Sequence, residues 1–371
     1  MSHADKPRRA LIVYNDGTVS SVVRAVQFQP LFQQSTQWQA DYVARNSVVL
    51  HKWLQRLNRP ALPLVMALLH RPLGAFAARW HRKRQDEIVR RAKDYDLVYV
   101  VKDGSLELYR RLKALGRPKV VADFNDGLWL PYFRDNGWSG LDTILACVDG
   151  VIAENDHVAE YARRHNPRVF VVSDAPQIEI FDRQRHTIQR HPQRVVLGWI
   201  GSEENIGHLY RLMEPLEALF ARHPHLHLRI VGARFNFIPH FEHVRWSCQP
   251  VLDQTHMVCE VLGFDIGLFP LFHLEDGRAR GTLKAKVYMS GGCVAVCEDY
   301  GENPKLIRDF HNGVLASTAA EWQDKLERLI LHPEERRAIA RQGLEDIREE
   351  YTGQHVFERL LGAFDRITAD E

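Results

Sequence analysis

The chain has 371 residues, with 49 Lys and Arg against 47 Asp and Glu, and a formal net charge of +2. Its length exceeds the ~150 residues of an average domain and predicts two domains, whereas the balanced charge argues against a protein dedicated to nucleic-acid binding, whose surface must neutralise many phosphates. Hydrophobic residues make up 45% of the chain and charged residues 26%, which is typical of globular rather than disordered or fibrous proteins.

No stretch has the pattern of a signal peptide or a membrane-spanning helix. The start, MSHADKPRRA, runs directly into the apolar LIVY, and the longest strongly apolar run, 61–69, is far shorter than the ~20 residues that span a bilayer. The five cysteines are widely spread and form no CxxC pair, which favours neither a disulfide framework nor a zinc site. We therefore expect a cytoplasmic protein with reduced thiols.

Continuous apolar runs in the first half predict buried strands. They lie at 10–14, 97–101, 119–124, 150–153 and 169–172, with helical stretches between them. A continuous run, rather than alternation, is typical of a parallel strand that is covered on both faces. The first half is thus expected to form an N-terminal, doubly wound α/β domain over residues 1–180.

A basic segment at 45–93 interrupts this pattern. It carries twelve Lys and Arg against two acids, Asp86 and Glu87, among many apolar and aromatic residues. Such a stretch either lies on an anionic membrane, where each basic residue contributes ~1 kcal/mol, or forms a solvated helix face beside ordinary core residues. The first alternative would place the protein at the inner face of the cytoplasmic membrane.

The second half repeats the strand pattern after a polar stretch. Residues 181–194 lack apolar periodicity and predict a domain linker. The strands expected beyond it are 195–200, 226–231, 243–248, 265–271, 293–297 and 313–316. They predict a second doubly wound domain over 195–351, followed by a C-terminal helix over 352–371 that could pack back on the N-terminal domain.

The strongest chemical signal lies at 265–303. A predicted strand leads into a loop with Arg280, a helix with Lys284, another strand, and a turn at Gly301. Helix N-termini beside the ends of parallel strands offer N–H groups and partial positive charge to a diphosphate. Arg280 and Lys284 would add the cations that a pyrophosphate leaving group requires. The plainer alternative is a surface Arg and Lys at a helix start.

Two motifs in this half resemble a known family. LKAKVYMSGGCVAV is similar to the donor-site signature of the GT-B glycosyltransferases of family 4, and VVLGWIGSEENIGHL to the first strand, turn and helix of their donor domain. The resemblance implies two Rossmann-like domains that face each other across a cleft. The N-terminal domain would bind the acceptor and the C-terminal domain the nucleotide sugar, with Lys284 aimed at the donor phosphates. The donor-binding residues that it implies are Gly201, Ser202, Arg280, Lys284, Gly301, Glu302 and Asn303.

The chain departs from this family where the nucleotide ribose is held. Many members carry a spaced pair of glutamates, and the corresponding positions hold Ala279 and Val287, whose side chains accept no hydrogen bond. The remaining candidates for this role are Glu275, Asp276 and Glu298. Because of this departure, the sequence does not identify the base of the donor nucleotide. It also leaves open the alternative that the protein is a catalytically inactive relative of the family.

Polar residues also follow a predicted strand of the first half. DFNDG places Asp123, Asn125 and Asp126 at the carboxyl end of the strand 119–124, where the crevice of an open α/β sheet lies. Asp126 is the candidate for orienting or deprotonating an acceptor hydroxyl. The alternatives are a divalent metal site built on spaced carboxylates and a simple Asn-Asp-Gly turn.

The motif YNDGTVSSVVRAVQ near the N-terminus adds two acceptor-side candidates. Gly17 follows the first predicted strand, and Arg24 lies in the helix after it. Arg24 either pairs with an acidic or phosphate-bearing acceptor or is an ordinary surface arginine.

These observations predict a glycosyltransferase that uses a UDP- or GDP-linked sugar and a glycan or lipid-linked acceptor. By resemblance it would retain the anomeric configuration, and it would need no metal and no cofactor, because Lys284, Arg280 and helix ends replace the metal. Two other classes stay open. One is a sugar-nucleotide epimerase on the same fold, and the other is a non-enzymatic binding or assembly protein.

Overall fold

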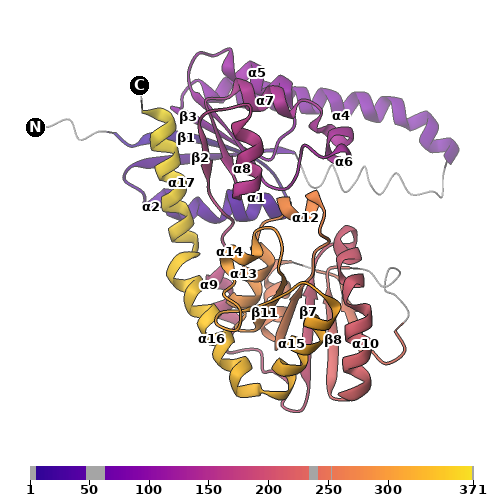
Figure 1. The fold of residues 1–371 in the computed structure, drawn as a ribbon. Coiled ribbons are helices and arrows are strands. Elements are labelled where there is room, and N and C mark those ends of the chain that lie inside the picture. Colours follow the sequence, from indigo (N-terminus) through magenta and orange to yellow (C-terminus); the bar gives the residue numbers. More distant parts are fainter. Residues whose placement is uncertain (1–5, 47–62, 234–240, 252, 370–371) are drawn as a thin grey trace, which may run out of the picture. The chain divides into compact units, whose positions relative to one another are not determined.

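The computed structural model describes residues 6–46, 63–233, 241–251 and 253–369, with side chains undescribed at 63–77. The chain forms two compact units, Met1–Ser173 with Phe357–Glu371, and Asp174–Val356 (Figure 1). Each unit contains a six-stranded sheet whose strands are all parallel. The predicted fold class, two Rossmann-like doubly wound α/β domains, is confirmed.

The N-terminal sheet has the strand order β2-β1-β3-β4-β5-β6. Its strands are β1 (Arg8–Asn15), β2 (Trp38–Asn46), β3 (Leu97–Val101), β4 (Lys119–Phe124), β5 (Gly150–Ala153) and β6 (Val169–Val171). The sequence analysis missed β2, because this edge strand is mostly polar and only partly buried. Its parallel pairing with β1, for example of Ile12 with Tyr42, identifies it as a strand, which the sequence pattern does not.

Helices flank this sheet, and side chains cap several of them. They are α1 (Val19–Arg24), η1 (Val26–Phe28), α2 (Gln29–Gln34), α4 (Pro63–Ala92), α5 (Leu106–Lys113), α6 (Pro131–Phe133), η2 (Arg134–Trp138), α7 (Leu141–Cys147) and α8 (Asp156–Arg163). The side chains of Thr18, Ser105 and Asn155 accept hydrogen bonds from the first turns of α1, α5 and α8, which satisfies N–H groups that a helix leaves unpaired.

The C-terminal helix α17 (Gly353–Thr368) joins this unit from Phe357 onward. Its Phe364 packs edge-on against Trp38 and Tyr99. Trp38 Nε1 also donates to Asp365 at 2.8 Å. The last segment of the chain therefore completes the core of the first unit.

The C-terminal sheet has the order β12-β11-β10-β7-β8-β9. Its strands are β7 (Val195–Ile200), β8 (Leu226–Val231), β9 (Trp246–Gln249), β10 (Ile266–Phe269), β11 (Val294–Glu298) and β12 (Val314–Ala316). The helices are α9 (Ile178–Gln184), η3 (Glu203–Leu212), α10 (Met213–Arg222), α11 (Gln254–Leu262), α12 (Glu275–Ala279), α13 (Leu283–Ser290), α14 (Asn303–Leu306), α15 (Ala319–Leu331) and α16 (Pro333–Glu350).

Both faces of the C-terminal sheet are buried. Along β7, Leu197 and Trp199 belong to one apolar cluster, while Val196 and Ile200 pack in another. Successive side chains of a strand point to opposite faces, so each face has its own core. This two-sided burial explains why the strands are continuous apolar runs in the sequence.

The domain boundary differs from the prediction. The expected linker 181–194 begins inside helix α9, where Phe181 is buried. The chain passes between units at Ser173 and again at Val356. Residues after α9 also pack on the second unit, since Arg190 donates to carbonyls there. The polar composition of this stretch wrongly indicated a linker, because a polar side chain such as that of Arg190 binds backbone carbonyl groups of the folded unit.

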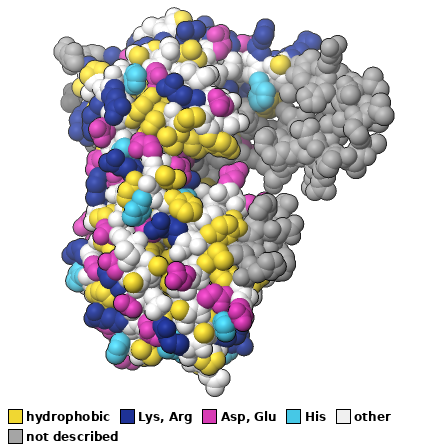
Figure 2. Space-filling view, turned by 45° about the vertical axis from the view of Figure 1, so that its right-hand side comes forward, with side chains coloured by type: hydrophobic (Ala, Val, Ile, Leu, Met, Phe, Trp, Pro, Cys, Tyr) yellow, Lys and Arg dark blue, Asp and Glu magenta, His cyan; other side chains and the backbone are white. Residues whose placement is uncertain are grey.

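Charged side chains of both signs share the surface, and the basic segment 45–93 is only partly described. Figure 2 shows basic and acidic side chains interspersed over the face drawn, in line with the net charge of +2. Among the described residues no helix is long and apolar enough to cross a membrane. Much of the segment 45–93 lies outside the described residues and side chains, so its contact with a membrane stays a prediction.

Candidate functional site

The order of the C-terminal strands reverses between β7 and β10, which are neighbours in the sheet. In open α/β sheets, ligands bind at such a switch point, outside the carboxyl ends of the strands. Gly201 and Ser202 directly follow β7, and the loop with Arg280 follows β10. The topology therefore brings the two predicted donor segments to one place.

Lys284 lies over the turn that follows β7. Its Nζ is 5.0 Å from the ring centre of Trp199 and 5.4 Å from that of Phe269. A Cβ atom added to Gly201 would lie 3.2 Å from Lys284 Nζ and 2.5 Å from the Trp199 ring. Because Gly201 has no side chain, the ammonium group of Lys284 can lie close to the backbone of this turn. Gly232, which the sequence analysis did not single out, tightens this turn, since a Cβ there would lie 2.2 Å from the Gly201 carbonyl oxygen.

Arg280 and His208 extend this positive site. Arg280 donates from Nε and Nη2 to Asp276 Oδ2 at 3.1 and 2.8 Å, and His208 Nδ1 accepts the N–H of Phe272 at 3.1 Å. Burial, together with the charges of Arg280 and Lys284, lowers the pKa of His208 to about 4. The two cations that contribute to this shift, Arg280 and Lys284, would also favour an anion at this site.

His208 should make the stability of the C-terminal unit depend on pH. Its folded pKa of about 4 lies below the ordinary 6.5, so the unfolded chain binds more protons between these values. Stability is therefore expected to fall as pH drops from 6.5 towards 4, by at most ~1.4 kcal/mol per pH unit. Thermal unfolding of wild type and His208→Gln across this range measures the effect. An unchanged pH dependence in the variant would contradict it.

Glu298 is buried at the end of β11. Its Oε1 accepts from Arg211 Nη2 at 2.8 Å and lies 2.9 Å from His273 Nε2. Burial raises the pKa of this carboxyl, whereas Arg211 opposes the shift. Of the candidates for the ribose, Glu298 and Asp276 are thus already engaged with basic side chains. His273 stacks on Tyr300 at 4.4 Å and 15°, so Glu298 fixes a ring at the rim of the loop.

The turn at Gly301 packs on the same loop. Gly301 has a φ of 62°, and a Cβ there would lie 2.9 Å from the Gly277 carbonyl oxygen. Asn303 is buried and donates from Nδ2 to the Glu298 carbonyl at 3.0 Å, and Glu302 pairs with Lys305 at 3.1 Å. These side chains hold the turn in place, and binding of a sugar or phosphate by its backbone stays a prediction.

Arg24 and Asp123 form a buried ion pair in the N-terminal unit. Arg24 donates from Nε and Nη2 to the two carboxylate oxygens at 2.5 and 2.6 Å, and the side chains are 2% and 0% exposed. Tyr99 donates to Asp123 Oδ2 at 2.5 Å. Arg24 is therefore not a surface arginine. The expectation that Arg24 and Asp123 face an acceptor was wrong, because the charge of each side chain is neutralised by the other inside the unit.

Asp126 remains at the surface of the same strand edge. Its Oδ2 lies 2.5 Å from Lys102 Nζ, and both side chains are about one quarter exposed. Both residues have positive φ, 64° and 45°, a strained conformation that is enriched at functional sites. Asn125 donates to Ser20 Oγ at 3.1 Å, while its Oδ1 is buried without a partner. Gly17, with φ of 75°, follows β1 at this edge.

The sequence analysis did not single out Lys102, whose role depends on β3 and β4 being neighbours in the sheet. Among residues with described side chains, no group of three or more His, Cys, Asp or Glu is placed to hold a metal ion.

Comparison with known proteins agrees with this geometry. Residues 211–362 match a family model described as glycosyl transferase-like. Anabaena HepE, solved with UDP, superposes with a TM-score of 0.66 at 13% identity over 96% of this chain and 100% of that one. Sucrose-phosphate synthase from Thermosynechococcus elongatus gives 0.64 at 12% identity over 97% and 99%. No curated protein matches the sequence.

The chain therefore has the GT-B fold, and its second half is similar to the glycosyl transferase-like family model over residues 211–362. The resemblance to GT-B glycosyltransferases is confirmed, whereas membership of family 4 stays a prediction.

Proposed function

We propose that the protein transfers a sugar from a nucleoside-diphosphate donor, preferably UDP-linked, to a glycan or lipid-linked acceptor. The observation that carries the proposal is the position of Lys284 Nζ over the Gly201 turn at the switch point of the C-terminal sheet. The glycosyl transferase-like match over 211–362 and the UDP and UDP-glucose complexes of Anabaena HepE support the choice of donor.

In the proposed reaction, the bond between the anomeric carbon and the β-phosphate oxygen breaks, and a bond to the acceptor oxygen forms. The departing diphosphate takes the electron pair, and Lys284 and Arg280 stabilise its charge. The acceptor hydroxyl passes its proton to the carboxylate of Asp126, the proposed group that orients and deprotonates this hydroxyl. We further propose that transfer retains the anomeric configuration and needs no metal, by resemblance to family 4.

The direct test combines binding and turnover. A panel of UDP-, GDP-, ADP- and dTDP-sugars is screened by thermal shift, where a ligand at 100 times its Kd should stabilise the protein by ~2.7 kcal/mol. The sugar that stabilises most is then incubated with glycan and lipid-linked acceptors, with and without EDTA. Acceptor-dependent release of the nucleoside diphosphate supports transfer. An epimerised donor without release would instead support an epimerase, and no stabilisation by any donor would favour a non-enzymatic protein.

Gly201→Ala is expected to weaken donor binding by at least ~10-fold, or ~1.4 kcal/mol. The new methyl group would lie 2.5 Å from the buried Trp199 ring and 3.2 Å from Lys284 Nζ, so the turn or the lysine has to move. Calorimetric titration with UDP measures the change. Gly207→Ala is the matched control, since a Cβ there meets nothing within 4 Å. Equal affinities of the two variants would contradict the prediction.

A further inference from the structure

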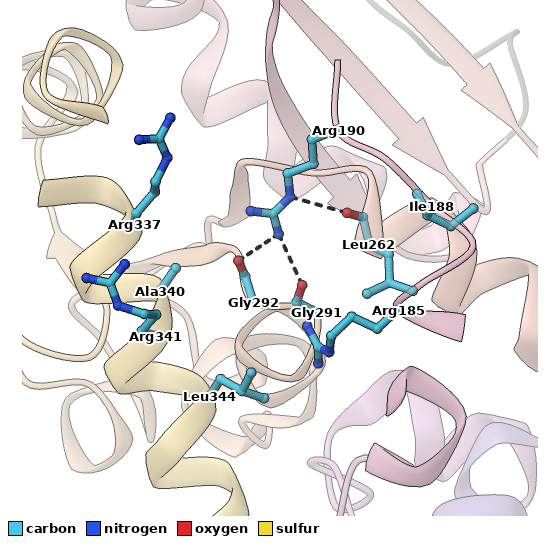
Figure 3. Close-up of a pocket in the computed structure, with 10 residues that line it drawn as sticks. All are labelled: Arg185, Ile188, Arg190, Leu262, Gly291, Gly292, Arg337, Ala340, Arg341 and Leu344. Atoms are coloured by element: carbon cyan, nitrogen blue, oxygen red, sulfur yellow. Dashed lines mark hydrogen bonds between the residues drawn. The ribbon is translucent and has the colours of Figure 1, made fainter. Parts of the chain in front are cut away.

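A basic cavity of about 370 Å³ lies at the edge of the C-terminal sheet opposite the donor loop, as we call residues 270–282 between β10 and α13 (Figure 3). It is lined by Leu262, Gly291 and Gly292, which precede β10 and β11, whereas the donor loop follows the end of β10. Four arginines and no acid are among its lining residues. These are Arg185, Arg190, Arg337 and Arg341.

Two of these arginines are held by backbone carbonyls. Arg190 donates from Nε to Leu262 O at 3.3 Å and from Nη2 to Gly291 O and Gly292 O at 3.1 and 2.6 Å (Figure 3). Arg185 Nη2 donates to Ser290 O at 2.7 Å. The carbonyls after helix α13 carry partial negative charge and favour cations. The guanidinium groups are therefore fixed before any ligand arrives.

Donor groups remain in the cavity after these bonds are formed. In the part of the chain that the structure describes, Arg190 Nη1 makes no hydrogen bond, and Arg185 Nε is buried without a partner. Arg341 is exposed and forms no ion pair or side-chain hydrogen bond with the described residues. Arginine donors that protein groups leave unsatisfied are available to a ligand.

The positive charge of this region is also poorly compensated. Asp182, the carboxylate nearest Arg185, is paired with Arg348 at 2.7 Å and lies 3.8 Å from Arg185. Burial lowers the pKa of the Arg185 guanidinium, Asp182 opposes this shift, and the charges of Arg348 and Arg190 add to it. Arg337 pairs with Glu334, but that carboxylate is 83% exposed, so water screens the pair.

An adjoining cavity of about 520 Å³ has the same character. Arg190 and Arg337 line it too, together with Arg194 and Arg336, and Asp265 is the one acid among its lining residues. Burial lowers the pKa of Arg336, Asp265 at 3.7 Å opposes this shift, and the charges of Arg337 and Arg190 add to it. The two cavities therefore form one basic region along this edge of the unit.

We propose that the 370 Å³ cavity binds a phosphoryl-bearing anion. Guanidinium groups match phosphate oxygens in pairs, and several of them without an acid favour a multiply charged ligand. The volume lies within the range of small-molecule sites, and Ile188, Leu262 and Leu344 offer an apolar wall. The site is distinct from the donor loop, because Ser290 ends helix α13 and Lys284 lies near its start, six residues or ~9 Å away along the helix axis.

Hydrogen exchange on the full chain tests the proposal with inorganic pyrophosphate as the probe. Pyrophosphate is expected to slow exchange in 185–194 and 334–344. Arg341→Ala should raise the Kd read from this protection by at least ~10-fold, since one cation of the site is lost. Arg341 is exposed, so the variant is expected to fold. Arg183→Ala is the matched control, because this exposed arginine of the neighbouring helix does not line the cavity.

A second arm identifies the source of the phosphate. Phosphatidylcholine vesicles with and without phosphatidic acid are pelleted with wild type, Arg341→Ala and Arg183→Ala. Pelleting that needs both phosphatidic acid and Arg341, without protection by pyrophosphate, assigns the site to a lipid headgroup. Protection by pyrophosphate assigns it to a soluble phosphate. Protection confined to 201–205 and 270–284, or equal behaviour of both variants in both arms, would overturn the proposal.

Discussion

Lys284→Ala is expected to lower turnover by at least ~100-fold, which corresponds to ~2.7 kcal/mol of lost transition-state stabilisation. The Nζ atom lies over the turn after β7 and 5.0 Å from the Trp199 ring, where the diphosphate of the proposed donor would sit. The charge on that group grows as the sugar departs, so kcat and kcat/KM should both fall. The rate of nucleoside-diphosphate release in the presence of acceptor measures the effect.

Lys325→Ala provides the control for this experiment. Lys325 belongs to the same unit and pairs with Asp309 at 2.8 Å, and it lies on helix α15 rather than in the donor loop. This variant should keep wild-type turnover. Near-normal turnover of Lys284→Ala would show that the lysine does not stabilise the negative charge of the leaving group. This conclusion would hold whether or not nucleotide binding changed.

Asp123→Ala is expected to cost the N-terminal unit about 3–5 kcal/mol of unfolding free energy. Arg24 is 2% exposed, so removing the carboxylate would leave a buried guanidinium without its counter-charge, and Tyr99 would lose its shorter hydrogen bond, the one of 2.5 Å to Asp123. Urea unfolding, followed by hydrogen exchange of β3 and β4, measures the loss. Asp86→Ala is the control: its pair with Arg111 is 55% exposed at the carboxylate and should contribute below ~1 kcal/mol.

A double variant separates the ion pair from simple packing. If the loss in Asp123→Ala comes from the unpaired charge, then Arg24→Met combined with Asp123→Leu should be less destabilised than Asp123→Ala alone. If the double variant is instead destabilised as much as the sum of two cavity-forming changes, the ion pair is not the cause.

The central strands of both sheets could be predicted from the sequence because they are buried on two faces. Leu97–Val101, for example, is a run of five residues that are all buried, and such a run is apolar at every position. Strand β2 could not be found in this way, because it lies at the edge of its sheet and exposes several of its residues. Its assignment depends on pairing with β1, which no local pattern encodes.

Some residues of the candidate site could be predicted from local sequence, whereas others could not. Lys284, Arg280 and Gly201 stand in motifs whose local order of strand, glycine turn and helix is legible in the sequence. His208 and Lys102 were missed, because their roles come from neighbours on other elements. The role of Arg24 was mispredicted for the same reason, since its partner Asp123 is 99 residues away in the chain.

The sequence by itself determined the two α/β layers, the glycine turn and helix around Lys284, and the resemblance to GT-B glycosyltransferases, because apolar runs and glycine turns are local properties of the chain. Only the tertiary structure decided which charges are neutralised. It paired Arg24 with Asp123 inside one unit, and it gathered four arginines around one cavity in the other. The electrostatic state of a side chain depends on distance and burial, which the folded arrangement sets.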